Sequence, residues 1–433
     1  MTQQQSSASI GGTGAGAGKY FLLGFLVILN ILNFVDRQLI ASFANDIVED
    51  LSLSNTQFAL ITGFAFTVFY SVAGLLVGSL VDTGNRPKLL ALGLFFWSFF
   101  TALTGAARSF VEMALPRMVI GVGESIQTPS SISMLSERFA QNQMAFASGI
   151  YYTGVPIGVG ISLLIVGLLG PEIGWRNCFY LMGVIGLCMV GILLLIRETP
   201  DRIEQIAARK ASAESRWTEI KKLAGDLRVE LVANPALLLT IAGGVVLHFV
   251  LGAAVFDQLW LVQELGFDRS WIALRTGLIF LVAGSLGNIF GGLCSDWVLK
   301  HTRFTRPLFL AALMLALAPI TVFYRLAGPE DWLLWVGISC AAFTLGAFYG
   351  PTFATVQELA PRQSRGTAIA LYILLLNLVG LGLGGLMCGI SIDVMQSLHV
   401  AKPYTWTLFW LNGLSTLCIP LFYWAHKSYG MKK

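Results

Sequence analysis

The chain has 433 residues, of which 55% are hydrophobic and only 12% are charged, and its mean hydropathy is +0.72. Soluble globular domains carry about 25% charged residues, so this composition excludes a soluble fold and indicates a membrane protein. The net charge of +4 does not indicate a nucleic-acid partner. The partner that the composition predicts is the lipid bilayer.

Twelve apolar runs follow one another along the chain, and each approaches or exceeds the roughly 20 residues that a helix needs to cross a bilayer. Their length and short connections predict α-helices, because a transmembrane β-barrel would show alternating segments of about 10 residues. We therefore expect an all-α membrane protein. The runs cover approximately residues 20–43, 57–81, 88–107, 110–135, 143–170, 177–196, 236–265, 271–295, 306–325, 332–357, 366–394 and 404–425.

Basic residues are distributed unevenly between the two ends of these runs. If both termini are cytoplasmic, the inner segments carry twenty of the twenty-eight Lys and Arg residues and the outer connections carry five. Cytoplasmic loops are enriched in Lys and Arg, so we expect both termini in the cytoplasm. The five outer residues are Arg108, Arg176, Arg269, Arg325 and Lys402.

One long polar connection, residues 197–235, interrupts the apolar pattern. It holds eight basic and seven acidic residues, which is typical of a charged cytoplasmic helix, although a solvated linker without a partner is the plainer interpretation. It separates an N-terminal bundle of six helices (19–196) from a C-terminal bundle of six (236–427). Residues 1–18 carry no charge and are expected to form a disordered tail, and residues 428–433 a short C-terminal tail.

Full charges lie inside three of the apolar runs. Asp36 and Arg37 are adjacent in the first run. Arg117 and Glu124 lie seven residues apart in the fourth, and Asp257 lies late in the seventh. A charge within a spanning helix costs at least about 2.5–3.5 kcal/mol, so such residues usually face a water-filled path or a binding cavity. They predict that something polar crosses, or is bound inside, the protein.

The charges of the first and fourth runs have the right signs to pair. Arg117 and Glu124 share one helix face, whereas the adjacent Asp36 and Arg37 point about 100° apart. We expect two cross-helix pairs, Asp36 with Arg117 and Arg37 with Glu124. The plainer interpretation is a static network that locks two helices, or an Arg117 that extends to the outer membrane interface.

The functional interpretation of these charges is proton exchange by a carboxyl group. Burial and a neighbouring Arg shift the pKa of a carboxyl group in opposite directions, so making or breaking a pair changes its affinity for a proton. We favour Glu124 as the proton carrier, with Asp36 next. Arg37 and Arg117 would then attract an anionic group of the substrate, because the planar guanidinium suits phosphate and carboxylate.

A short motif is repeated in the two halves. Gly78–Asp82 ends the second run and Gly292–Asp296 ends the eighth, and basic residues follow both. Glu137–Arg138 ends the fourth run, and Glu358 with Arg362 ends the tenth. Equivalent motifs at matching places indicate an internal repeat, and repeated bundles around a midplane site are typical of secondary transporters.

These features resemble the major facilitator superfamily over essentially the whole chain. The turn at residues 78–88 matches the superfamily's signature loop, although Thr83 stands where Arg is usual; Trp175–Arg176 and Gly154–Gly158 also fit. The resemblance implies two pseudo-symmetric six-helix bundles, and it implies gate residues that hold the inner side shut; ordinary solvation of loops is the plainer interpretation. The gate residues would be Gly78, Asp82, Arg86, Lys88, Arg138, Gly292, Asp296, Glu358 and Arg362.

Two longer motifs resemble the spinster family of lysolipid and sphingolipid transporters. Asn33–Arg37 resembles its Asn-Tyr-x-Asp-Arg motif, and Arg117–Ser125 resembles its Arg-x-x-x-Gly-x-Gly-Glu-Ala motif. The resemblance implies a bacterial homologue in an inner membrane that carries a lysophospholipid or a sphingoid phosphate. Organic-anion transporters share the Asp-Arg pair, so a carrier of small anions such as sugar acids is the alternative.

Polar and aromatic side chains of other runs are candidates for a substrate cavity, although each is more often a packing residue. The second half lacks a charge at the midplane, so we expect an amphipathic substrate to place its head group against the first bundle and its tail against the second. The candidates are Tyr151, Tyr152, Thr153, His248, Trp260, Tyr349, Tyr372 and Asn377.

The expected function is alternating-access transport by a monomer, driven by a proton gradient, because no ATP-binding motif is present. A lipid-modifying membrane enzyme, with Glu124 and His248 as acid and base, is a distant alternative, as is a passive scramblase or channel. The six cysteines all lie within apolar runs and the four histidines are scattered, so we expect neither a metal nor another cofactor.

Overall fold

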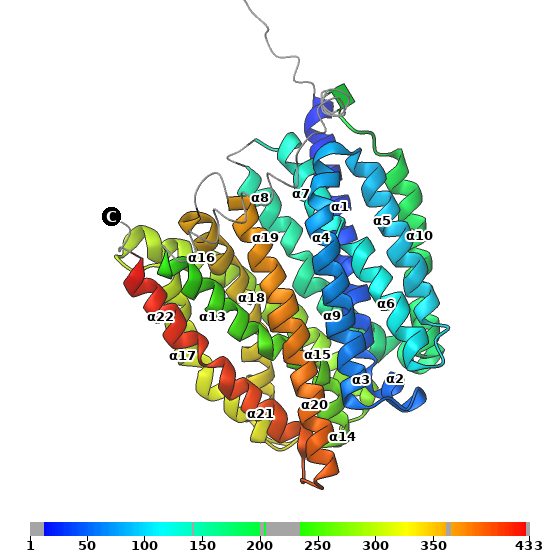
Figure 1. The fold of residues 1–433 in the computed structure, drawn as a ribbon, viewed down its shortest axis with the longest axis vertical. Helices are drawn as coiled ribbons and strands as arrows, with labels where there is room; N and C mark the ends of the chain where they lie inside the picture. The colour runs from blue at the N-terminus through cyan, green and yellow to red at the C-terminus, as the bar shows by residue number, and fades with distance from the viewer. Residues whose placement is uncertain (1–12, 141–142, 200–202, 205–233, 361–364, 430–433) are drawn as a thin grey trace, which may run out of the picture.

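Figure 1 shows the computed structural model, which describes residues 13–140, 143–199, 203–204, 234–360 and 365–429. Within these ranges the chain forms helices joined by short turns, with no β-strand. Eleven of the described helices are long and apolar enough to cross a membrane. The predicted all-α membrane fold is therefore confirmed.

The predicted fourth span is the one with no helix among these eleven. It consists of α6 (Phe110–Glu124) and α7 (Gln127–Arg138), which follow one another through the first bundle (Figure 1). At the break, the Ser125 hydroxyl donates to the carbonyl of Val122 at 2.7 Å, and such back-bonding bends helices. Glu124, the predicted proton carrier, is the last residue before this break.

The first bundle contains the elements from α1 to α10. Besides α6 and α7, it is built from α1 (Thr13–Ser42), α2 (Ala44–Asp50), α3 (Asn55–Ala59), η1 (Leu60–Phe64), α4 (Ala65–Thr83), α5 (Arg86–Thr104), α8 (Met144–Tyr152), α9 (Gly154–Leu168) and α10 (Gly170–Leu195).

The second bundle contains the elements from α13 to α22. They are α13 (Pro235–Ala253), η2 (Ala254–Phe256), α14 (Asp257–Gln263), α15 (Arg269–Ile279), η3 (Phe280–Gly284), α16 (Ser285–His301), α17 (Arg306–Phe323), η4 (Tyr324–Leu326), α18 (Trp332–Leu359), α19 (Arg365–Leu375), η5 (Leu376–Leu383), α20 (Gly384–Ser397), α21 (Pro403–Ser415) and α22 (Cys418–Ser428).

The predicted segment boundaries differ from the structure at the start of the chain. α1 begins at Thr13, inside the predicted tail, because adding a residue to an existing helix costs little once the helix is nucleated. The second bundle begins at Pro235, one residue before the predicted boundary. Residues 1–12 and 430–433, and most of the predicted linker (200–202 and 205–233), lie outside the described residues.

Different elements lie at the two ends of the molecule. The start of α1 and the end of α22 lie at the upper end in Figure 1, and α2, α3 and α14 lie at the lower end. We call these the terminal end and the far end.

Small residues allow the two bundles to approach closely. A methyl group added to Gly160 of α9 would lie 3.0 Å from the carbonyl oxygen of Gly277 of α15, and the reverse distance is also 3.0 Å. At the far end, a methyl group added to Gly389 of α20 would lie 2.5 Å from the carbonyl oxygen of Asn55. Glycine lets helix backbones meet at such distances, so the bundle interface depends on these positions.

Helix α3–α4 of the first bundle and helices α15–α16 and α19–α20 of the second each contain one π-helical segment: η1, η3 and η5. The segments η1 and η5 pack against each other across the bundles, and η3 packs against α9. Short π-helical segments are uncommon and often occur at functional sites. Their place here is the interface that must rearrange if the bundles move.

Candidate functional site

The site is built around an ion pair between Arg37 of α1 and Glu124 of α6. The Nε and Nη2 atoms of Arg37 both donate to Oε2 of Glu124, at 3.1 and 2.9 Å. The Glu124 side chain is completely buried, and that of Arg37 is 18% exposed. The structure thus forms the predicted pair. The second carboxylate oxygen, Oε1, has no hydrogen-bond partner among the described residues.

Aromatic rings surround the guanidinium of Arg37. Its central carbon lies 5.1 Å from the ring centre of Phe34, 4.7 Å from that of Phe66 and 4.8 Å from that of Tyr70. The central guanidinium carbon of Arg117 lies 5.0 Å from the centre of the same Phe66 ring. Stacking on rings stabilises a guanidinium and leaves its edge available to an anion. Tyr70 was missed by the sequence analysis; its position one helical turn from Phe66 is the only signal.

The second predicted pair, Asp36 with Arg117, is not formed. Both residues are only 1% exposed, but no ion pair joins them in the described structure; Nη2 of Arg117 instead donates to the carbonyl of Arg37 at 3.4 Å. Neither carboxylate oxygen of Asp36 has a hydrogen-bond partner among the described residues. Because successive helix residues point about 100° apart, Asp36 turns away from Arg37 and lies beside Trp97 of α5. Arg117 does not extend to the membrane interface.

His248 and Tyr349 of the second bundle lie across from this pair. The Nε2 atom of His248 is 3.2 Å from the Tyr349 hydroxyl, and its Nδ1 is 3.2 Å from the carbonyl of Gly244. A carbonyl can only accept, so we assign the ring proton to Nδ1 and the Tyr349 hydroxyl as donor to Nε2. Gly380 of η5 packs against His248, and Gly382 of the same segment packs against Thr67 of α4 in the first bundle. The structure therefore brings groups of both bundles to one central site.

Three predicted cavity residues lie where α8 passes into α9. Tyr151 is buried, its hydroxyl has no partner among the described residues, and its ring meets that of Tyr152 at 5.2 Å. Asn30 of α1 donates to the carbonyl of Tyr151 at 2.8 Å, which holds this segment against α1. Tyr152 is 41% exposed. Thr153 donates its hydroxyl to the carbonyl of Ile150 at 2.7 Å, so that donor is used within the helix.

The remaining candidates all lie in the second bundle, and two of them belong to its hydrophobic cores. Tyr372 of α19 is buried, with its ring 5.2 Å from that of Phe353 and its hydroxyl unpartnered in the described structure. Asn377 donates to the carbonyl of its own helix residue Ile373 at 2.8 Å. Trp260 lies elsewhere: its indole donates to the Thr405 hydroxyl at 2.8 Å within the far-end core. The structure thus does not bring Trp260 to the central site.

At the terminal end, Arg86 is the centre of a charge cluster within the first bundle. It is the first residue of α5, and its Nη2 lies 2.5 Å from both Glu137 of α7 and Glu198. Glu198, which follows α10, also accepts from the backbone and Nε of Arg86. Burial raises the pKa of Glu198, but these hydrogen bonds outweigh it and hold the pKa below its ordinary value. Glu198 was missed by the sequence analysis because it lies in the predicted linker.

Arg306 forms the matching cluster in the second bundle. It is the first residue of α17, and it lies 2.9 Å from Asp296 of α16 and 2.6 Å from Glu358 of α18. Arg362, another of the predicted gate residues, lies outside the described residues. Arg306 was not among the predicted gate residues, although an Arg-Pro pair begins both α5 and α17 and would have identified it.

The other predicted gate residues contribute less to these clusters. Lys88 is exposed and Arg138 half-buried, without an ion pair among the described residues. Gly292 packs against Gly350 of α18. The surroundings of Gly78 and the side chain of Asp82 lie outside the described part of the chain.

The bundles are joined by polar contacts at the far end. Asp393 of α20 accepts four hydrogen bonds from the start of α3: from the backbone and side chain of Asn55 (3.0 and 2.8 Å) and of Thr56 (2.8 and 2.6 Å). The Tyr404 hydroxyl donates to Oδ1 of Asn55 at 2.7 Å. Asp393 thus caps a helix of the other bundle. The sequence contains no local signal for this contact.

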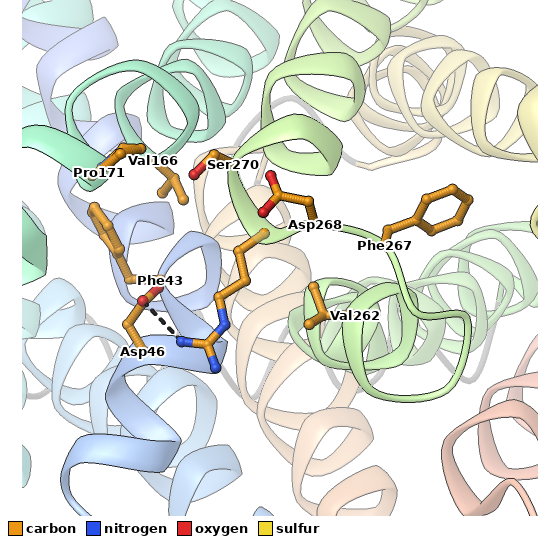
Figure 2. Close-up of a pocket in the computed structure, with 10 residues that line it drawn as sticks. Phe43, Asp46, Val166, Pro171, Val262, Phe267, Asp268 and Ser270 are labelled. Atoms are coloured by element: carbon orange, nitrogen blue, oxygen red, sulfur yellow. Dashed lines mark hydrogen bonds and ion pairs between the residues drawn. The ribbon is translucent and has the colours of Figure 1, made fainter.

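A second far-end contact lies beside a cavity of about 370 Å³ between the bundles (Figure 2). Arg269, the first residue of α15, pairs with Asp46 at 3.2 Å and with Glu49, both of α2. Asp46 enters from the first bundle, and Asp268 and Ser270 enter from the second (Figure 2). In addition, Asn45 donates to the carbonyl of Gln258 of α14 at 2.9 Å.

Within the first bundle, Trp175 and Arg176 hold α2 in place for these contacts. The indole of Trp175 donates to Oδ2 of Asp50 at 2.9 Å, and Arg176 forms an ion pair with the same carboxylate. The hydrogen bond from Arg176 lowers the pKa of Asp50.

The distribution of contacts defines the conformation. Every side-chain hydrogen bond and ion pair that joins the two bundles in the described structure lies at the far end. At the terminal end, the charge clusters of Arg86 and Arg306 each stay within one bundle. The molecule is therefore held shut at the far end.

Comparisons with known proteins agree with this architecture. The chain is 26% identical over 404 residues to an MFS-type efflux pump of Mycolicibacterium smegmatis (93% of this chain and 91% of that protein). It is 26% identical over 315 residues to Protein spinster of Drosophila melanogaster (70% and 50%) and 27% identical over 379 residues to a hexuronate transporter of Bacillus subtilis (85% and 87%).

A solved structure has the same fold. It is a bacterial homologue of the human lysosomal transporter spinster in an inward-facing, unoccupied conformation, which superimposes with a TM-score of 0.77 at 21% identity and covers 97% of this chain and 98% of that one. The family model of the Major Facilitator Superfamily matches residues 26–385. The chain belongs to the Major Facilitator Superfamily.

Proposed function

We propose that this transporter moves an amphipathic, lipid-like substrate of the lysophospholipid or sphingoid-phosphate type by alternating access, coupled to protons. The observation that carries the proposal is the buried Arg37–Glu124 pair near the bundle interface, while the hydrogen bonds and ion pairs that join the bundles lie only at the far end among the described residues. A charge pair at a bundle interface is where substrate binding and rocking can act on the same groups.

Coupling follows from competition for one guanidinium. Arg37 already gives two N–H groups to Glu124, and a substrate phosphate or carboxylate would seek the same donors, since guanidinium binds such groups through paired hydrogen bonds. A substrate that withdraws Arg37 leaves Glu124 buried without its counter-charge, which is costly while Glu124 is ionised. Taking up a proton removes that cost. Asp36, already unpaired, is the second candidate carrier, and Arg117 the second anion-binding group.

Support for the lipid-like substrate comes from the rings and apolar walls around the site and from the similarity to Protein spinster. The alternative substrate is a small organic anion such as a sugar acid. Its support is the similarity to a hexuronate transporter and the two buried guanidinium groups, which also suit a carboxylate.

The terminal end is proposed to face the cytoplasm of a bacterium, with the protein in the inner membrane as a monomer. The excess of Lys and Arg in the segments at that end supports this orientation. The far-end closure then corresponds to an inward-facing state, which is the state that the solved spinster homologue is said to occupy. We propose no catalytic role for any residue.

Uptake into proteoliposomes tests the proposal. The purified protein is reconstituted, and uptake of a labelled lysophospholipid and of a labelled hexuronate is measured with and without an imposed pH gradient. Gradient-driven accumulation of the lysophospholipid supports the proposal, and accumulation of the hexuronate alone supports the alternative. Uptake that ignores the pH gradient for both probes contradicts proton coupling.

Glu124→Gln identifies the carrier in the same assay. We expect gradient-driven uptake to be lost, while exchange of labelled for unlabelled substrate continues, because Gln keeps a hydrogen-bond acceptor for Arg37 but cannot carry a proton. Glu112→Gln is the matched control, since Glu112 is an exposed carboxylate at the start of the same helix. Full gradient-driven uptake by Glu124→Gln would remove Glu124 from the mechanism.

A further inference from the structure

The second bundle contains an ion pair of its own, between Asp257 and Arg325. Oδ1 of Asp257 lies 2.8 Å from Nη1 of Arg325. The Arg325 side chain is 2% exposed, so it is not the outer-loop residue that the sequence predicted. The pair is remote from the Arg37–Glu124 site along the chain and belongs to other helices. Ionisable residues within a membrane domain mark functional sites more often than not.

The pair borders a cavity of about 90 Å³ inside the second bundle. Thr344 of α18 and Asn412 of α21 line the same cavity, and the Thr344 hydroxyl and the Asn412 side-chain oxygen have no hydrogen-bond partner among the described residues. The Asp257 side chain retains 24% of its accessible surface. A cavity of this size with several polar partners has room for water, so Asp257 can exchange a proton with it.

Both members of the pair lie where a helix departs from α-geometry. Asp257 directly follows η2, the 3₁₀ turn that separates α13 from α14, and Arg325 lies within η4, the 3₁₀ turn after α17. A short 3₁₀ segment within a long helix, such as η2, often marks a hinge, and a terminal 3₁₀ turn such as η4 leads into a connecting loop. The pair therefore joins two segments that can each reorient without unfolding a helix.

The α14 segment also takes part in the far-end closure. Gln258, the residue after Asp257, accepts through its carbonyl from Asn45 of the first bundle at 2.9 Å. Its side chain donates to the Thr276 hydroxyl of α15 at 3.1 Å. Asp257 therefore lies next to a residue that contacts the first bundle, so breaking its ion pair with Arg325 can affect that contact.

The charge balance around Asp257 is simple. Arg325 and Tyr324 face it from η4, and Cys388 faces both members of the pair from α20. Among the described residues no other charged group forms an ion pair with Asp257. The neutral pair has little need of a bound ion, because an added cation or anion would leave a net charge in the bundle. The ligand that the site can take is the proton, with cavity water as its source.

We propose that Asp257 is a second proton-binding site of this transporter, in the second bundle, and that its protonation releases α14 and weakens the far-end closure. The proton passes from cavity water to the Asp257 carboxylate, the ion pair breaks, and the guanidinium of Arg325 turns to the cavity water and its polar lining. The proposal depends on membership of a transporter family and not on the substrate or on the carboxylates of the first bundle.

Two measurements on the full-length protein without substrate test it. Infrared difference spectra between about pH 8 and about pH 5 detect the carbonyl stretch of a carboxyl group that becomes protonated. Hydrogen–deuterium exchange at the same two pH values measures opening of α2, α3 and α14, with α5 as an internal reference. The variants are Asp257→Asn, the double variant Asp257→Asn/Arg325→Gln, which leaves no unpaired charge, and Glu330→Gln as an exposed control.

We expect one carboxyl band to be lost in both Asp257 variants and kept in the control. In the wild type, far-end exchange should be faster at the lower pH relative to α5. In Asp257→Asn it should be fast at both pH values, since Asn imitates the protonated acid, and in the double variant it should not depend on pH. Faster exchange throughout both bundles in Asp257→Asn would indicate that this variant is destabilised as a whole. The pH dependence of far-end exchange in the double variant then decides whether Asp257 is the proton-binding group.

Two results would overturn the proposal. The first is a set of carboxyl bands unchanged by loss of Asp257, which would make the pair a permanent structural link. The second is an acid-induced far-end opening that persists in both Asp257 variants. Bands that disappear in Glu124→Gln or Asp36→Asn report on the first bundle instead, so failure of the proposed coupling there would be seen separately.

Discussion

Asp393→Ala is expected to shift the transporter from the state closed at the far end toward a state open there. Asp393 accepts four hydrogen bonds from Asn55 and Thr56 and so caps α3 from the other bundle. These bonds exist only while the far end is shut. Alanine removes them all, and Asp393→Asn keeps a single acceptor oxygen, so its effect should be smaller.

The magnitude follows from the loss of a helix cap. Replacing an N-cap acceptor by Ala costs about 0.5–2 kcal/mol, and a hydrogen bond to a charged group contributes about 1.5–3 kcal/mol. In the open state water replaces the bonds to Asp393, which is half-buried, so we take about 2 kcal/mol as the difference between the two states. This corresponds to about a 30-fold shift in the equilibrium.

Distances between spin labels at the far end measure this shift. The labels are placed at Arg108 of the first bundle and at Trp332 of the second, which are both exposed. The six free cysteines are first replaced by alanine so that only these two positions are labelled. We expect a longer distance population to grow in Asp393→Ala. Asp331→Asn is the control, because Asp331 accepts from Gly328 within its own bundle. An unchanged distribution in Asp393→Ala would refute the view that this cap holds the far end shut.

Two further predictions concern stability. Arg86 holds the pKa of Glu198 below its ordinary value, so the stability that this ion pair contributes is complete above about pH 4.3, the unfolded pKa, and is lost as the pH falls through the folded pKa. Glu198→Gln should therefore lower the free energy of unfolding by about 1–2 kcal/mol at neutral pH and weaken the acid dependence of the melting temperature. An unaltered acid profile in this variant would contradict the prediction. Gly291→Ala should lower the melting temperature by the equivalent of about 1–3 kcal/mol, because its methyl group would lie 2.2 Å from the carbonyl oxygen of Ala347. Gly292→Ala is the control, because its methyl group would meet open space. Equal effects of the two substitutions would argue against close packing of α16 on α18.

The charged residues of the first bundle show how far sequence reasoning reaches. A charge in an apolar run predicts a buried functional group, and the burial of Asp36, Arg117 and Glu124 agrees with it. The Arg37–Glu124 pair was also expected, since each of the two runs carries one charge of each sign. The Asp36–Arg117 pair failed, because the direction of a side chain depends on the rotation of its helix about its own axis. The hydrophobic pattern does not determine that rotation to within one residue.

Contacts made by polar residues at helix ends were not predicted from the sequence. Arg325 was placed in an outer loop because it ends an apolar run, and only the packing of η4 against α14 shows that it pairs with Asp257. Likewise, Asn55 and Asp393 lie 338 positions apart in the chain, and neither has a local pattern that distinguishes it from an ordinary polar residue at a helix end.

Sequence alone determined that this chain is a helical membrane protein, where its helices run and which charges lie within them, because hydrophobic length and the cost of buried charge are properties of local segments. Tertiary structure decided which charges meet, at which end the bundles are joined and where the second ion pair lies. Those outcomes depend on the rotation and close approach of whole helices, which arise from the packing of all the side chains together.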